Sequence, residues 1–173
     1  MDVAPEDHSS YVVSMNHMLF VDLDGVLADF DRGVFELTGS YPNEMHPRKM
    51  WPRLATAEGF YAHLPWMPDG VELWNGVKHH DPVILTGLPM GKWAEPQKRT
   101  WCSRELGPEI PVITCMSRDK AQKARDYAGP SLIPILIDDR IKLKEAWEAM
   151  GGVFIHHTSA AASLKLLSHV VRS

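Results

Sequence analysis

The fold of this 173-residue chain is organised around residues 18–29, which read MLFVDLDGVLAD. The first four of these residues form an apolar, β-favouring run, and carboxylates and a glycine follow directly. Such a run predicts a buried parallel strand rather than a helix. The carboxylates then lie at the carboxyl end of the strand, where loops form the ligand-binding crevice of open α/β sheets.

Asp22 and Asp24 at this strand end would repel each other unless a positive charge lies beside them. Carboxylate oxygens without neighbouring Cys or His favour Mg²⁺ over Zn²⁺. The alternative is an Asp pair that only caps a strand-to-loop turn. The sequence further along the chain favours the metal.

The composition indicates one domain with a modest insertion. Apolar residues make up 45% of the chain, but no run of about 18 of them predicts a membrane span. Residues 1–15 resemble neither a signal peptide nor a transit sequence, so we expect a flexible lead-in. Two Cys suggest reduced thiols and a cytoplasmic protein. A net charge of −4 argues against binding to a nucleic-acid duplex.

Residues 31–68 differ in texture from the rest of the chain. Five prolines divide the region after Gly39 into brief helical turns, and many aromatic residues are interspersed. We interpret residues 31–68 as a small helical cap inserted after the first strand. Residues 16–30 and 69–173 would then form the catalytic core.

Strands and helices alternate regularly after residue 68. The predicted strands are 82–86, 111–115, 133–139 and 153–155, and the predicted helices are 69–77, 94–106, 119–127, 141–150 and 159–171. This alternation indicates an α/β fold, a three-layer Rossmann-like parallel sheet with helices on both faces.

Polar groups of complementary kinds end several of these strands. The groups are Asp22 and Asp24, Thr86 and Gly87, Asp138 and Asp139, and Lys120 at the start of the helix after the third strand. Parallel strands bring these ends to one edge of the sheet. Carboxylates, a hydroxyl, backbone N–H groups and an ammonium together describe a site for a phosphoryl group and a metal.

The charges suggest a mechanism. A phosphate monoester resists attack by a carboxylate until its own charge is neutralised, which Mg²⁺, Lys120 and the Thr86 hydroxyl would do. Asp22 would be the nucleophile and form an aspartyl-phosphate. Asp24 would protonate the leaving oxygen and later activate water, which requires a raised pKa.

These residues, in this order on alternating strands, resemble the four motifs of the haloacid-dehalogenase-like (HAD) hydrolases. Within that superfamily the chain is most similar to the 5′(3′)-deoxyribonucleotidases, over most of its length, including 59–61, 98–101 and 136–140. The resemblance implies Mg²⁺ held by Asp22, by the backbone carbonyl of Asp24, and by one of Asp138 and Asp139. The other of that pair would hold a water ligand or Lys120, and the order stays open.

The same resemblance implies that Thr86 and Lys120 bind phosphate. One departure is Gly87, where those nucleotidases often have Ser, so a side-chain contact is lost and only the backbone N–H remains. In the resembling family, aromatic cap residues sandwich a nucleobase. The candidates here are Phe30, Trp51, Phe60, Tyr61 and Trp66; the alternative is that they form the cap's own core.

We therefore predict a Mg²⁺-dependent phosphomonoesterase that dephosphorylates (deoxy)nucleoside monophosphates. One alternative keeps the chemistry but uses a sugar phosphate, another small phosphate ester, or the phosphorylated end of a nucleic acid. Another is a non-catalytic nucleotide-binding module. The resemblance, together with several Trp side chains suited to a surface, favours a homodimer. Base preference, sugar preference and the position of the phosphate lie beyond the sequence.

Overall fold

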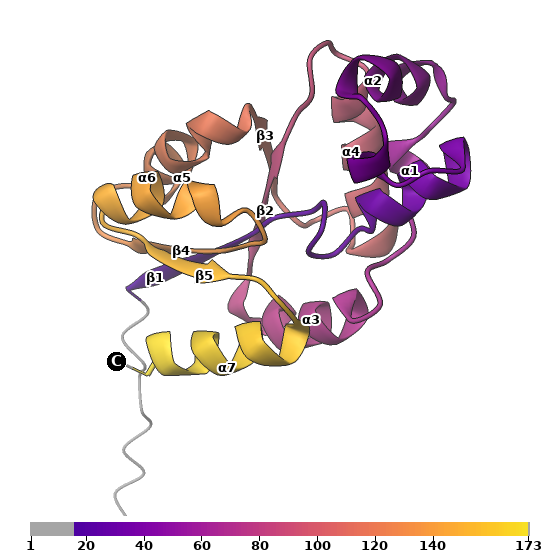
Figure 1. Cartoon of the computed structure of the whole chain (residues 1–173). Helices are drawn as coiled ribbons and strands as arrows, with labels where there is room; N and C mark the ends of the chain where they lie inside the picture. The colour runs from indigo at the N-terminus through magenta and orange to yellow at the C-terminus, as the bar shows by residue number, and fades with distance from the viewer. Residues whose placement is uncertain (1–15, 173) are drawn as a thin grey trace, which may run out of the picture.

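The computed structural model describes residues 16–172, and a parallel five-stranded sheet lies at its centre (Figure 1). The strand order is β3-β2-β1-β4-β5. The strands are β1 (His17–Val21), β2 (Val83–Gly87), β3 (Val112–Cys115), β4 (Ile133–Asp138) and β5 (Val153–His156). This architecture confirms the predicted α/β fold. The predicted lead-in, residues 1–15, lies outside the described residues.

Within residues 16–172, seven α-helices connect these strands or follow them. They are α1 (Phe30–Thr38), α2 (Pro47–Thr56), α3 (Gly70–Val77), α4 (Ala94–Glu105), α5 (Lys120–Ala128), α6 (Lys144–Ala149) and α7 (Ala160–Val170). Short 3₁₀ turns span Pro42–Glu44 (η1), Tyr61–His63 (η2), Lys78–His80 (η3), Ser117–Asp119 (η4) and Ile141–Leu143 (η5).

Successive side chains of a strand point to opposite sides of the sheet. Helices cover both of these sides. Figure 1 shows α5 and α6 on one face and α3 and α7 on the other. Phe20 of β1 packs in the cluster that contains Trp147 of α6. Its neighbours Leu19 and Val21 pack in the cluster that contains Leu167 of α7. The central strand is therefore buried on both sides, as its continuous apolar run predicts.

The region predicted as a cap folds as helices, but α2 is longer than predicted. Instead of brief turns, ten residues form one helix that passes through Pro52. Pro47 at its first position suits a helix start, and the ring of His46 accepts a hydrogen bond from the backbone N–H of Arg48. Helix α1 ends at Thr38, and its cap residue Gly39 has a φ of 79°, which suits glycine. The assignment of residues 31–68 to a separate cap stays a prediction.

The state of the two cysteines and the start of α7 agree with the predictions from the sequence. Cys102 of α4 and Cys115 of β3 are buried and free. The Ser159 hydroxyl accepts from the backbone N–H of Ala162, which starts α7 as predicted. Within residues 16–172, no helix has the length and apolar character needed to cross a membrane.

Candidate active site

The carboxyl ends of β1 and β4 lie side by side at the centre of the sheet, where the strand order reverses. Ligands bind at such a switch point because the loops leaving the two strands diverge there. Asp22 follows β1 directly, and its backbone N–H donates to the carbonyl of Ile137 at 3.0 Å. Asp138 is the last residue of β4. The predicted carboxylates therefore meet at one edge because the register between β1 and β4 places them there.

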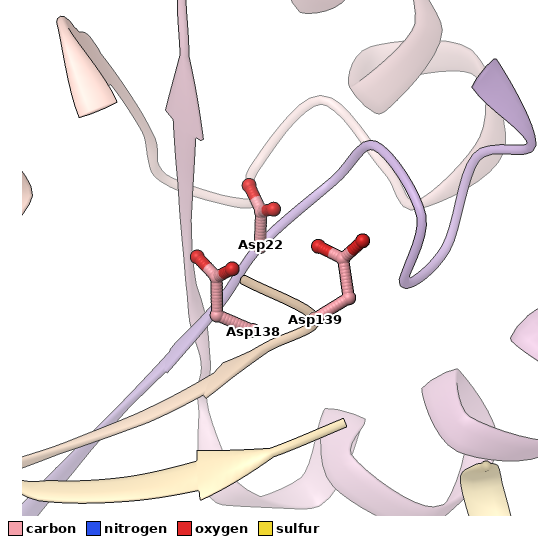
Figure 2. A group of neighbouring side chains, drawn as sticks. All are labelled: Asp22, Asp138 and Asp139. Carbon is pink, nitrogen blue, oxygen red and sulfur yellow. The ribbon is translucent and has the colours of Figure 1, made fainter. Parts of the chain in front are cut away.

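Three carboxylates converge at this edge, as Figure 2 shows. Asp22, Asp138 and Asp139 each offer an oxygen, and these oxygens all lie within 4.8 Å of one another. Asp22 and Asp138 are buried, whereas Asp139 is exposed. The Asp24 side chain does not belong to this group, so its predicted contribution through the backbone carbonyl stays a prediction.

Lys120 bridges two of these carboxylates from the start of α5. Its Nζ donates to Asp22 Oδ1 at 2.8 Å and to Asp138 Oδ2 at 2.7 Å. Burial alone would lower the pKa of Lys120, but the charges of Asp22 and Asp138 outweigh burial and raise it. The side chain is thus a permanent cation beside the predicted nucleophile. It also lines the cavity described below.

Asp138 and Asp139 have different surroundings. Both carboxylate oxygens of Asp138 are engaged, one by Lys120 and the other by the backbone N–H of Arg140 at 2.8 Å. The carboxylate of Asp139 accepts a hydrogen bond only from its own backbone N–H among the described residues. It lies against Gly25, where an added Cβ would come within 2.5 Å of Asp139 Oδ2. Gly25 also has a φ of 79°, so glycine suits both the backbone and the neighbouring carboxylate.

Burial raises the pKa values of both acids at the end of β4. The pKa of Asp138 rises to about 6 because the side chain is buried and lies near the charge of Asp22; Lys120 opposes this rise. The pKa of Asp139 also rises to about 6, for the same first two reasons. Such groups exchange protons easily near neutral pH and are stabilised in their charged form by a cation.

The donor set fits Mg²⁺. Three hard carboxylate oxygens of Asp22, Asp138 and Asp139 face a common point, as Mg²⁺ prefers. Asp22 Oδ2 has no hydrogen-bond partner among the described residues, and the Asp139 carboxylate accepts only from its own backbone N–H, so both are accessible to a cation.

Asp24 occupies a second, separate ionic site. Its Oδ2 forms an ion pair with Lys98 Nζ, whereas its buried Oδ1 has no hydrogen-bond partner among the described residues. Burial raises the pKa of Asp24, and the positive charge of Lys98 opposes this rise. A carboxyl group with a raised pKa and one unpartnered oxygen suits the acid/base role predicted for it.

Lys98 was not singled out as a site residue by sequence reasoning. Its Nζ, only 1% exposed, also donates to Thr86 Oγ1 at 3.0 Å and to the carbonyl of Gly87 at 2.7 Å. The sequence did carry a signal, which is the helical spacing of Lys98 with apolar residues. The buried residues of α4 are Ala94, Lys98, Trp101 and Cys102. A lysine in the apolar stripe of a helix needs a buried anionic partner.

Thr86 is fully buried behind the strand end and does not line the cavity. Because its hydroxyl oxygen accepts from Lys98, its own proton can be donated elsewhere. The predicted contact between Thr86 and phosphate stays a prediction. Gly87 does line the cavity.

A cavity of about 510 Å³ opens above the strand ends. Its lining joins two regions, the carboxylate edge and the helical segment after β1. From the first come Asp22, Asp24, Ser117, Lys120, Asp139 and Arg140, and from the second Asp29, Phe30, Asp31, Trp51, Tyr61 and Met67.

Three of the five predicted cap residues line this cavity as a row of rings. Phe30 is stacked on Tyr61, with ring centroids 6.0 Å apart, and lies 5.9 Å from Trp51. Tyr61 in turn covers Lys98, whose Nζ lies 4.4 Å from the ring centroid. The cap is thereby connected to the Lys98 site.

Phe60 and Trp66 do not line the cavity, in contrast to the prediction for them. Phe60 is buried and packs edge-on against Phe30 at 5.7 Å. Trp66 packs against Trp101 of α4 at 4.9 Å, and its indole N–H donates to Glu105 at 2.8 Å. Phe60 belongs to the core within the cap segment and Trp66 to the core between that segment and α4, which was the alternative for each of the five.

Known proteins were compared with the chain. No protein-family model matches it. A curated protein of Vibrio phage KVP40, named "Putative 5'(3')-deoxyribonucleotidase", is 30% identical over 138 residues, which are 78% of this chain and 72% of the phage protein. The chain belongs to the haloacid-dehalogenase-like hydrolases. The predicted resemblance to the 5′(3′)-deoxyribonucleotidases is thereby confirmed.

Two solved structures are similar to the chain. A hydrolase from Streptococcus pneumoniae TIGR4 is similar with a TM-score of 0.55 and 15% identity, over 89% of this chain and 99% of that one. A haloacid-dehalogenase-like hydrolase from Burkholderia xenovorans LB400 has a TM-score of 0.49 and 13% identity, over 80% of each chain. The similarity to the Streptococcus hydrolase shows that the two proteins share a fold.

Proposed function

We propose that this HAD hydrolase is a Mg²⁺-dependent phosphomonoesterase that releases phosphate from nucleoside or deoxynucleoside monophosphates through an aspartyl-phosphate. One observation carries the proposal: a single cavity joins the carboxylate edge around Asp22 to the ring row of Phe30, Trp51 and Tyr61. A phosphate at the edge and a flat base at the rings would both fit in it. The printed name of the phage relative supports the same substrate class.

In the first step, a carboxylate oxygen of Asp22 attacks the phosphorus and the bond from phosphorus to the ester oxygen breaks. Asp24 gives its proton to the departing oxygen. Two features support these roles, since Asp22 Oδ1 is held by Lys120 and Asp24 has a raised pKa. Lys120 balances the charge that gathers on the phosphoryl oxygens.

In the second step, the Asp24 carboxylate takes a proton from water, whose oxygen attacks the phosphorus. The bond to Asp22 breaks, which frees phosphate and restores the Asp22 carboxylate. Mg²⁺, when bound, would neutralise the charge of the phosphoryl oxygens. Asp22 and Asp139 have oxygens free for it, so we assign Asp139 as a direct ligand and Asp138 as the residue that holds Lys120.

The cavity wall beside the rings is acidic, which favours monophosphates. Asp29 and Asp31 both line it, and burial together with the charge of Asp29 raises the pKa of Asp31. Carboxylates in this part of the wall would accept hydrogen bonds from sugar hydroxyls and repel a second or third phosphate. We therefore expect nucleoside di- and triphosphates to be poor substrates.

The test is phosphate release from deoxy- and ribonucleoside 5′- and 3′-monophosphates, the matching triphosphates and common sugar phosphates, each with Mg²⁺ and with a chelator. Asp22→Asn serves as the inactive variant. Asp126→Asn makes the same change on the exposed surface of α5 and serves as the control.

We expect Mg²⁺-dependent release from a narrow set of nucleoside monophosphates, and none from Asp22→Asn. Release from sugar phosphates alone would exclude a nucleoside substrate and leave the proposed phosphatase chemistry in place. Normal turnover by Asp22→Asn would exclude Asp22 as the nucleophile.

A further inference from the structure

Gly87, the last residue of β2, and Ser117, the first residue of the turn η4 that follows β3, lie against each other at the cavity. A Cβ added at Gly87 would collide with Ser117 Oγ, well inside van der Waals contact, and would lie 3.5 Å from Ser117 Cβ. The Ser117 hydroxyl therefore fills the space into which a side chain at position 87 would extend. Position 87 has no side-chain hydroxyl of its own, and the Ser117 hydroxyl lies in that place instead.

The Ser117 hydroxyl has an unused donor. Its oxygen accepts from Arg140 Nη1 at 2.9 Å, and this is its only hydrogen bond among the described residues. It makes no capping bond to the turn η4 or to α5, where a serine hydroxyl often serves. Because the oxygen is held as an acceptor, the O–H proton remains free to be donated toward the cavity.

The neighbours of Ser117 suit an anion. Lys120, three residues further along, lines the same cavity, as do Arg140 and Gly87. The hydroxyl of Thr86, by contrast, lies fully buried behind the strand end. Ser117 is thus the cavity-lining hydroxyl beside the two cations at this edge.

We propose that Ser117 is a phosphate-binding residue of this site. Its O–H donates to a phosphoryl oxygen from the place that a side chain at position 87 would occupy, and Arg140 orients it. The proposal rests on the phosphoryl-transfer part of the proposed function and is independent of the nucleoside. Because hydrogen bonds to a charged acceptor are stronger than neutral ones, its loss is measurable.

The first test measures the affinity for inorganic phosphate, by calorimetry in the presence of Mg²⁺ and by competitive inhibition of p-nitrophenyl phosphate hydrolysis. Ser117→Ala is expected to weaken phosphate binding about 10-fold without changing Tm. Ser168→Ala on α7 is the matched control, since its hydroxyl donates only to a local carbonyl. Arg140→Gln is expected to weaken phosphate binding about threefold, and Arg118→Gln, an exposed arginine of η4 outside the cavity, is expected to leave it unchanged.

The second test moves the hydroxyl from position 117 to position 87. Gly87→Ser alone should weaken phosphate binding by more than about 10-fold, because the new Cβ displaces Ser117. The double variant Gly87→Ser with Ser117→Ala should recover to within about threefold of the wild type, because one hydroxyl again serves the same place.

Unchanged phosphate affinity in Ser117→Ala would overturn the proposal. So would a double variant as weak as the product of the two single effects. The phosphate readout does not require a nucleotide, so failure of the proposed substrate class would leave this test intact.

Discussion

Two buried lysines hold the two predicted catalytic aspartates, and they do so in different ways. At the Lys120 site, formed by Lys120, Asp22 and Asp138, one ammonium lies between two carboxylates and faces the cavity. At the Lys98 site, formed by Lys98, Asp24 and Thr86, one ammonium holds a carboxylate, a hydroxyl and a carbonyl, and it lies behind the cavity wall.

The difference shows how one residue type serves two tasks. The cation that faces the cavity can neutralise substrate charge directly. The cation behind the wall acts on the reaction through Asp24, whose orientation and pKa it influences. The following predictions test this division, from the largest expected effect to the smallest.

Lys120→Met should lower kcat by about 10³-fold, because it removes the charge beside the phosphoryl group and leaves two buried carboxylates unbalanced. The measurement is p-nitrophenyl phosphate hydrolysis at saturating Mg²⁺, with Tm recorded in parallel. Lys123→Met on the exposed side of α5 is the control. A loss of less than 10-fold in a folded variant would contradict a direct role for Lys120.

Asp139→Asn should weaken Mg²⁺ binding by about 100-fold, because it removes a carboxylate that faces the shared point and has no hydrogen-bond partner on another described residue. Asp138→Asn should weaken it less and lower kcat more, since its main partner is Lys120. The rise of Tm with Mg²⁺ concentration measures the first effect and steady-state kinetics the second. The reverse order would exchange the roles of the two acids.

Lys98→Met should lower kcat/KM by 10- to 100-fold and shift its pH profile. Lys98 holds down the pKa of Asp24, so its removal should raise that pKa further. The protonated acid would then persist to higher pH, and the alkaline fall of kcat/KM should move upward. An unchanged pH dependence of kcat/KM would show that Lys98 only supports the structure.

The metal-free protein should be more stable at pH 5 than at pH 7, by about 1 kcal/mol from Asp138. The folded pKa of Asp138, about 6, lies above the ordinary 3.8, so the folded state binds more protons between these values. Its stabilising contribution is complete below about pH 4 and is lost as the pH rises through 6. Urea unfolding with a chelator measures this difference.

Asp138→Asn should reduce this pH difference, and Mg²⁺ should stabilise the wild type more at pH 7 than at pH 5. Equal stability of the metal-free wild type at the two pH values would contradict the raised pKa.

Phe30→Leu should raise KM for a nucleoside monophosphate about fivefold while changing KM for glycerol 2-phosphate little. Phe30 is stacked on Tyr61, the ring that covers Lys98, so this variant also tests whether the Lys98 site extends into the cap. Phe35→Leu, on the exposed side of the same helix, is the control. An equal rise of both KM values would place Phe30 in the cap core instead.

Much of the fold was predictable because its signals are local. The apolar run before Asp22, the alternation after residue 68, and the caps at Gly39 and Ser159 all depend on neighbours in the sequence. Helix α2 is longer than the sequence predicts, because proline usually breaks a helix but α2 passes through Pro52.

The candidate site was predictable only in part. Residues that end strands could be placed together, since parallel strands share an edge. Lys98 lies in the middle of a helix, so its role became clear only where α4 packs against β2. The same holds for the aromatic residues: nothing local distinguishes Phe30, which lines the cavity, from Trp66, which packs on Trp101.

The sequence by itself determined the α/β fold, the order of the polar strand ends and the resemblance to the HAD hydrolases, because periodicity and motif spacing are encoded along the chain. Only the tertiary structure decided which acid pairs with Lys120, that Lys98 holds Asp24, and that Ser117 fills the space beside Gly87. These are contacts between residues far apart in the sequence. They depend on register and packing, which bring side chains within hydrogen-bond distance without leaving a local pattern.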